Sequence, residues 1–300
     1  MNCASMITIP DLQTSLLDLL FEIEGTDIKL IIGGGFGIYL KIGYVQRLGI
    51  RTLLQEWPEP RSTNDLDLFL RPELLIESAK LKPMAKAIAR LNYKVVPGAE
   101  KYQFVRPSSR GTVSASVKID ILTGPQDRFH GTPVRTDARR VRPKPSVGIH
   151  AHPVDEALTL EEGLLPILLS GKLSSGEPRK AEVLLPHPYT FLMMKLFAFK
   201  DRLEDADKEF GRYHALDLYT ILSTTTEKEW RYALKLRDQH GDKPYVREAG
   251  CLVSEHFSAL DRLGMIRLRE SIYYKPELQI DEFMSAIQEL FPVTAETSSI

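Results

Sequence analysis

The feature that most constrains the fold of this chain is a run of three glycines, Gly33 to Gly35, between two apolar segments. The stretch KLIIGGG predicts a short buried strand followed by a tight turn, and FGIYLKIGYVQRLGI predicts a helix. Backbone N–H groups at a helix N-terminus can hold an anion. The turn therefore serves either close packing or phosphate binding.

The residues around the glycines exclude two common phosphate-binding motifs. The dinucleotide fingerprint G-x-G-x-x-G requires a glycine where this chain has Ile38 or Leu40. The P-loop requires G-x-x-x-x-G-K-[ST], but the only Gly-Lys pair, Gly171-Lys172, is followed by leucine and preceded at the required distance by proline. What remains is a Gly-Gly turn between a strand and a helix, which by itself is more typical of tight packing.

Three aspartates on predicted strands are the second feature. Asp65 and Asp67 alternate with leucines in DLDLFLR, so their carboxylates share one face of the strand, with backbones ~7 Å apart. Asp120 interrupts the apolar strand SASVKIDIL, where an ionised carboxylate without a partner is costly. A solvated face, a helix cap or an arginine partner would explain these acids, and so would a three-carboxylate site for divalent cations.

The order of strand and helix signals predicts the fold class. The first 122 residues mix strands with helices, which indicates an α+β (α/β) fold with a mixed sheet flanked by helices. Residues 123–148, with four prolines and three glycines, are expected to be a loop or irregular excursion. Strand signals return before residue 186, and nearly every later segment has helical spacing. We therefore expect a sheet domain over residues 1–186 and a helical domain over residues 187–300.

Composition indicates a soluble globular chain and excludes several other classes. The net charge is −1, so a nucleic-acid partner would need a local basic patch. Cys3 and Cys251 form neither a disulfide framework nor a zinc motif. The uncharged run near the glycines ends at Lys41, short of the ~20 residues of a membrane span. We expect a cytoplasmic protein that does not insert into a membrane.

The order of the motifs resembles a known superfamily. A Gly-Gly turn after a strand, D-x-D on the next strand and a single Asp on a later strand resemble the polymerase-beta-like nucleotidyltransferases. Within that superfamily the chain is most similar to the AbiEii-type and MenT-type toxin nucleotidyltransferases. PYTFLMMKLFAFKDR resembles their K-L-x-A-x-x-x-R helix, and YHALDLYTIL resembles their D-L-Y helix. The stretch over residues 41–60 is longer than is usual there, and we interpret it as an insertion.

The resemblance implies a magnesium-dependent enzyme that moves a nucleoside monophosphate from a triphosphate such as ATP to an acceptor hydroxyl. Its helical domain would complete the active site. The implied catalytic and metal-binding residues are Asp65, Asp67 and Asp120, which would hold two Mg²⁺ ions. The implied nucleotide-binding residues are Gly34, Gly35, Lys195 and Asp217. Because Arg61, Ser62 and Thr63 lie next to the acids in the sequence, we add them as candidate donors to the phosphates.

The role of Lys195 has a structural alternative, and the role of the glycine turn sets a condition on the fold. Lys195 lies beside an apolar helical stripe, so it is either a phosphate ligand or a lysine whose stem packs while its head reaches water. Gly34 and Gly35 must also lie close enough to Asp65 and Asp67 for one triphosphate to touch both pairs.

The acceptor is suggested by a basic cluster between residues 128 and 144. Six cations accompany a single acid, Asp137: Arg128, Arg135, Arg139, Arg140, Arg142 and Lys144. Such a patch suits RNA, and the resemblance implies a tRNA 3′ end as acceptor, a toxin or phage-defence role, and a cognate antitoxin partner. A solvated, flexible loop or a site for an acidic partner protein would also explain the patch.

Other acceptors and another class of protein stay open. The acceptor could instead be a protein hydroxyl or a small molecule such as an aminoglycoside, and the chain could be a non-catalytic, antitoxin-like binding module. His150 and His152 share a strand face, but no third ligand has suitable spacing, so we expect them to be structural or surface residues.

Overall fold

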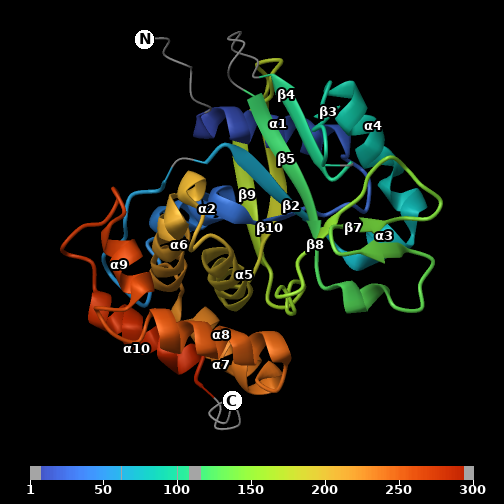
Figure 1. Ribbon diagram of the computed structural model, residues 1–300. Helices are drawn as coiled ribbons and strands as arrows, with labels where there is room; N and C mark the ends of the chain where they lie inside the picture. The colour runs from blue at the N-terminus through green and yellow to red at the C-terminus, as the bar shows by residue number, and fades with distance from the viewer. Residues whose placement is uncertain (1–7, 62, 100, 108–115, 294–300) are drawn as a thin grey trace. The chain divides into compact units, whose positions relative to one another are not determined.

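The computed structural model describes residues 8–61, 63–99, 101–107 and 116–293 (Figure 1). The chain divides into two compact units. Unit 1 comprises residues 1–37, 62–155 and 164–186, and unit 2 comprises residues 38–61, 156–163 and 187–300. One boundary between the units falls at residue 186, and residues 38–61 and 156–163 group with the helical unit. The predicted domain organisation itself stays a prediction.

Unit 1 is built on a mixed eight-stranded sheet, which confirms the predicted α+β fold class. The strand order is β3-β4-β5-β2-β1-β10-β9, and β8 pairs with β5 (Figure 1). The strands are β1 (Ile31–Ile32), β2 (Asp65–Leu70), β3 (Lys94–Val95), β4 (Gln103–Pro107), β5 (Ser116–Thr123), β8 (His152–Pro153), β9 (Leu165–Lys172) and β10 (Pro178–Leu185). Parallel pairs are β1–β10, β2–β5 and β5–β8, and the other neighbours are antiparallel.

The period-2 pattern of β5 explains how this strand carries both core and site residues. Val117, Ile119 and Ile121 are at most 1% exposed. Lys118 and Asp120 alternate with them and are only partly buried. Since successive side chains of a strand point to opposite faces, the apolar set packs while the charged pair stands on the other face.

The helices of unit 1 begin at local start signals. Helix α1 (Ile9–Glu22) packs against β2, β5, β9 and β10 and buries the leucines of its apolar stripe. Residues 72–90 form two helices, α3 (Pro72–Ile76) and α4 (Lys82–Arg90), which are separated by a 3₁₀ turn. Pro83 lies in the first turn of α4, where its missing N–H is tolerated and where it prevents an unbroken helix.

The segment expected to be an irregular loop contains a separate hairpin. Strands β6 (Arg135–Asp137) and β7 (Arg140–Arg142) pair antiparallel and form a two-stranded sheet. Val141 is fully buried and bridges to Ala151. Prolines flank this short apolar-polar alternation on both sides, and they conceal the strand signal in the sequence.

Unit 2 is helical, as predicted. It contains α5 (Pro188–Asp201), α6 (Arg212–Ser223), α7 (Glu227–His240), α8 (Pro244–His256), α9 (Leu263–Arg269) and α10 (Ile280–Leu290). Helix α5 packs against α6, α7 and α8, and α6 packs against α9 and α10. Helix α2 (Gly34–Leu48) begins in unit 1 and continues into unit 2 after Gly37. In the described part of the chain, no helix combines the length and apolar composition needed to span a bilayer.

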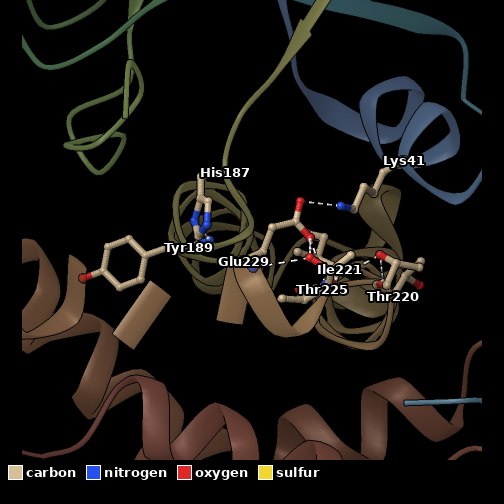
Figure 2. Close-up of polar contacts among 9 residues, drawn as sticks. Lys41, His187, Tyr189, Thr220, Ile221, Thr225 and Glu229 are labelled. Carbon is tan, nitrogen blue, oxygen red and sulfur yellow. Dashed lines mark hydrogen bonds and ion pairs between the residues drawn. The ribbon is translucent and has the colours of Figure 1, made fainter. Parts of the chain in front are cut away.

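A buried ion pair connects α2 to α7 within unit 2 (Figure 2). The ammonium of Lys41 donates to Glu229, and both side chains are less than a fifth exposed. The other oxygen of Glu229 accepts from the backbone N–H and the hydroxyl of Thr226, at 2.8 and 2.9 Å, in a capping box that begins α7. Burial lowers the pKa of Lys41, although Glu229 acts to raise it. Burial acts to raise the pKa of Glu229, but Lys41 and Thr226 together outweigh this effect and lower it.

Candidate functional site

The structure brings the three predicted aspartates together in unit 1. One carboxylate oxygen from each of Asp65, Asp67 and Asp120 lies within 4.8 Å of the others. This group, which we call the carboxylate triad, is the only cluster of three or more potential metal ligands among the described residues. The spacing predicted from alternation along two strands is therefore realised in the fold.

Strand register explains how residues more than fifty positions apart converge. β2 and β5 are parallel neighbours, with Asp67 opposite Asp120 and Asp65 opposite Lys118. Neighbouring strands of a sheet lie about 4.7–4.9 Å apart. Four charged side chains thus form a two-by-two group on one face of the sheet, with three anions and one cation.

The glycine turn lies directly against the triad. The backbone N–H of Gly33 donates to the carbonyl of Asp67 at 2.8 Å, which ties the turn to β2. Gly34 has φ +58°, and a Cβ placed there would lie 1.7 Å from Oδ2 of Asp67. Gly34 and Gly35 are also the first two residues of α2, where the N–H groups of a helix lack acceptors within the helix. The close approach required by the sequence hypothesis is present for Gly34 and Asp67.

Two predicted hydroxyl donors precede the triad. The hydroxyl of Thr63 donates to Oδ1 of Asp65 at 3.0 Å, and Thr63 is only 5% exposed. This contact orients the Asp65 carboxylate, so Thr63 is engaged with the triad itself. Ser62 lies outside the described residues. Phosphate binding by either hydroxyl stays a prediction.

Lys118 is the direct partner of Asp120. Its ammonium donates to Oδ2 of Asp120 at 2.9 Å, and its side chain is 35% exposed against 13% for Asp120. Burial raises the pKa of Asp120, Lys118 and the Gln103 side chain oppose this rise, and the nearby Asp65 carboxylate adds to it. Burial lowers the pKa of Lys118, but the three carboxylates together outweigh that effect and raise it. The sequence hypothesis allowed an arginine partner for Asp120, but the partner in the structure is this lysine.

The triad offers the donor set of a hard divalent cation. Its ligands are oxygens only, as Mg²⁺ and Ca²⁺ prefer. Oδ1 of Asp120 is buried and has no hydrogen bond of standard geometry within the described part of the chain. A cation held between the three carboxylates would remove their mutual repulsion and satisfy this oxygen. The residues present could therefore hold a metal ion.

A second charged cluster lies in unit 2 and includes the other predicted site residues. Asp217, on α6, accepts two hydrogen bonds from the Arg61 guanidinium, each at 2.8 Å. Lys195, on α5, lies 2.7 Å from the Oδ2 atom of Asp217. The guanidinium of Arg61 also lies over the ring of Tyr213, 5.5 Å from its centroid. We call Arg61, Lys195 and Asp217 the ion triplet.

The ion triplet is buried and carries one net positive charge. The side chains of Asp217 and Lys195 are 3% and 8% exposed. Burial would raise the pKa of Asp217, but Arg61 and Lys195 hold it well below its usual range. Burial also lowers the pKa of the adjacent His214 to about 3, and Lys195 reinforces this effect. Lys195 and Asp217, which the resemblance implies as nucleotide-binding residues, are in direct contact, whereas the hydrogen bonds from Arg61 to Asp217 have no signal in the sequence.

The basic cluster of residues 128–144 is only partly free of internal partners. Asp137 lies 3.3 Å from Arg140 and 3.1 Å from Arg142, so the hairpin β6–β7 neutralises part of its own charge. The other four basic residues are exposed: Arg128, Arg135, Arg139 and Lys144. This hairpin presents cations on the surface of unit 1, and it belongs to no metal-ligand group among the described residues.

The two histidines near this hairpin have structural contacts. Nδ1 of His152 lies 2.9 Å from the carbonyl of Arg139, and its ring lies 5.6 Å from that of Tyr102. Burial, reinforced by Lys101 and Arg140, lowers the pKa of His150 to about 4. These placements agree with the structural interpretation of both residues.

Comparisons with known proteins identify no family for the chain. No protein-family profile matches it, and no curated protein is similar to it. One solved structure with some likeness is the solution structure of the antibiotic-resistance factor ANT(2'')-Ia, described as revealing substrate-regulated conformation dynamics. It has 13% sequence identity and a TM-score of 0.35, over 77% of this chain and 99% of that one. Such a score is too low for an inference, so the proposals below take nothing from this structure and rest on the residues of the chain and on the resemblance of its sequence motifs.

Proposed function

We propose that this protein is a metal-dependent nucleotidyltransferase that moves a nucleoside monophosphate from a triphosphate to an acceptor hydroxyl. The observation that supports this most directly is the position of Gly34, at the start of α2, against one of the three clustered carboxylates. Helix N-termini favour phosphate oxygens, and carboxylate groups favour the metal ions that accompany a triphosphate.

In this proposal the carboxylate triad holds Mg²⁺ and the glycine turn holds phosphate. Bound metal would lower the pKa of the acceptor hydroxyl and neutralise the pyrophosphate that leaves. The residues of the chain have separate tasks: Asp65, Asp67 and Asp120 supply ligand oxygens, Thr63 orients Asp65, and the backbone of Gly34 and Gly35 faces the triphosphate. The bond that forms joins the acceptor oxygen to the α-phosphorus, and the bond that breaks releases pyrophosphate.

Lys195 and Asp217 enter the proposal through the resemblance of their helices. The net positive charge of the ion triplet suits a phosphate, and Asp217 holds the two cations at fixed positions. Lys195→Met should therefore raise KM for the nucleotide more than it lowers the affinity of the protein for metal. Equal effects on both quantities would contradict a phosphate-binding role.

We further propose RNA, and specifically a tRNA 3′ end, as the acceptor. The exposed arginines of the β6–β7 hairpin support this choice, because cations that neutralise phosphates supply most of the affinity for nucleic acid. A toxin or phage-defence role with a cognate antitoxin follows from the resemblance alone. The hairpin can be tested with Arg135→Gln and Arg139→Gln, which should weaken RNA binding and reduce its salt dependence.

Labelled nucleotide identifies the acceptor. The protein, Mg²⁺ and α-labelled triphosphates are incubated in parallel with total RNA, with cell protein and with an aminoglycoside. We expect label on RNA with the wild type and none with Asp67→Asn. Label on protein or on the aminoglycoside would keep the enzyme class and change the acceptor. A biological effect that survives both Asp65→Ala and Asp67→Ala would instead indicate a non-catalytic binding module.

A further inference from the structure

Lys118 is a cation built into a site whose other three charged members are carboxylates. It stands opposite Asp65 on the neighbouring strand and two residues before Asp120 on its own strand. Its ammonium binds Oδ2 of Asp120, whereas Oδ1 of the same carboxylate is buried without a standard hydrogen bond in the described part of the chain. One oxygen of Asp120 is thus bound by Lys118, and among the described residues the other has only the Gln103 side chain of the neighbouring strand as a hydrogen-bonding group, at a geometry poorer than that of a standard hydrogen bond.

We propose that Lys118 is a positioning residue and a permanent counter-charge of the carboxylate triad. It holds Asp120 so that a single oxygen ligates the metal, and it weakens the affinity of the triad for its first divalent cation. This inference rests on the proposed function, because it concerns the metal site assigned there.

The charge balance explains the consequence. Three carboxylates with Lys118 leave two negative charges, which one divalent cation neutralises in full. A second cation would then be held only when additional negative charge arrives, and a nucleoside triphosphate supplies such charge. Without Lys118 the triad keeps its third negative charge and attracts divalent cations more strongly.

A substitution at Lys118 has two opposing effects on metal affinity. Loss of the hydrogen bond frees Asp120 to rotate, which weakens binding modestly. Removal of a positive charge that lies at hydrogen-bond distance from a ligand strengthens binding of a divalent ion by about tenfold or more, even with partial screening by water. The charge effect is larger, so the net change should be tighter binding. If the ion pair had a purely structural role, replacement of Lys118 would instead weaken metal binding.

The test is a titration of the full chain with Mn²⁺ in the absence of nucleotide. Calorimetry and electron paramagnetic resonance measure the binding. We expect the wild type to bind one Mn²⁺ weakly and Lys118→Met to bind it about tenfold more tightly. Lys118→Arg, which keeps the charge and a donor, should restore the wild-type affinity. Lys94→Met removes an exposed lysine from β3 of the same sheet and should change nothing.

Several results would overturn the inference. These are unchanged or weaker Mn²⁺ binding by Lys118→Met, a Lys118→Arg variant that behaves like Lys118→Met, or no Mn²⁺ binding by either the wild type or Lys118→Met. Circular dichroism of each variant separates these outcomes from misfolding. If the Mn²⁺ results follow expectation while no nucleotide is transferred to any acceptor, the proposed function fails and the role of Lys118 stands.

Discussion

Replacement of Asp217 by asparagine should destabilise the protein strongly. Asparagine keeps the shape of the side chain but removes the negative charge that faces Arg61 and Lys195. The three hydrogen-bond and ion-pair distances to Asp217 are 2.7–2.8 Å, and its side chain is 3% exposed. Breaking a buried ion pair by removal of one partner typically costs about 3–5 kcal/mol. We therefore expect Asp217→Asn to lower the free energy of unfolding by about that amount.

The cost arises because the buried Lys195 and the partly buried Arg61 both lose the negative charge of Asp217, so removal of the lysine charge should recover part of it. Lys195→Met in the Asp217→Asn background should be more stable than Asp217→Asn alone, by at least about 1 kcal/mol. Glu227→Gln is the matched control, because its partner Arg231 and Glu227 itself are 72% and 79% exposed. This control should change stability by less than about 1 kcal/mol.

Urea unfolding monitored by circular dichroism measures these differences. The pH dependence gives an independent check, because the pKa of Asp217 is lowered in the folded state. Its contribution is present above the ordinary carboxylate pKa and is lost as the pH falls through the lower, folded value. In Asp217→Asn this part of the acid-induced loss of stability should be absent. A cost below about 1 kcal/mol for Asp217→Asn, or no recovery in the double variant, would refute the reasoning.

Three further changes test separate parts of the structure. Gly34→Ala should lower the free energy of unfolding in urea by about 3 kcal/mol, because its Cβ would meet Asp67. Gly98 also has a positive φ but has open space around it, so Gly98→Ala should cost about 1 kcal/mol. Equal costs for the two variants would contradict the close approach of Gly34 to Asp67. Burial lowers the pKa of His187 to about 4, so the unfolded state takes up the proton first and stability should fall by up to about 3 kcal/mol between pH 6.5 and 4. His187→Gln should reduce this fall in stability, and an unchanged dependence of stability on pH would show that His187 is not its cause. Thr226→Ala should cost about 1 kcal/mol by loss of the α7 cap, and a melting temperature equal to that of the wild type would show that the cap is dispensable.

The sequence was sufficient for features that depend on local periodicity. Alternation along DLDLFLR and SASVKIDIL predicted strands with Asp65, Asp67 and Asp120 in positions to share a face, and the structure confirms their convergence. The glycine turn could also be located, because a strand signal ends and a helix signal begins there. The mixed sheet and the later helical segment followed from the same kind of pattern.

Features that depend on long-range pairing could not be predicted. Arg61 lies 156 positions from Asp217, and Lys41 lies 188 positions from Glu229, so no local pattern connects the partners. Lys118 was visible two residues before Asp120, but its place beside the triad depends on the register of β2 against β5.

The proposed chemistry is tested most directly by the fate of the α- and γ-phosphates of one triphosphate. The protein is incubated with Mg²⁺, RNA and a nucleoside triphosphate labelled at either the α- or the γ-phosphorus, with Asp67→Asn as control. We predict that the wild type attaches α-label to RNA, attaches no γ-label, and releases the γ-label as pyrophosphate. Asp67→Asn should attach no label and release no pyrophosphate. Attachment of γ-label, or equal attachment of α-label by Asp67→Asn, would contradict nucleotidyl transfer by the carboxylate triad.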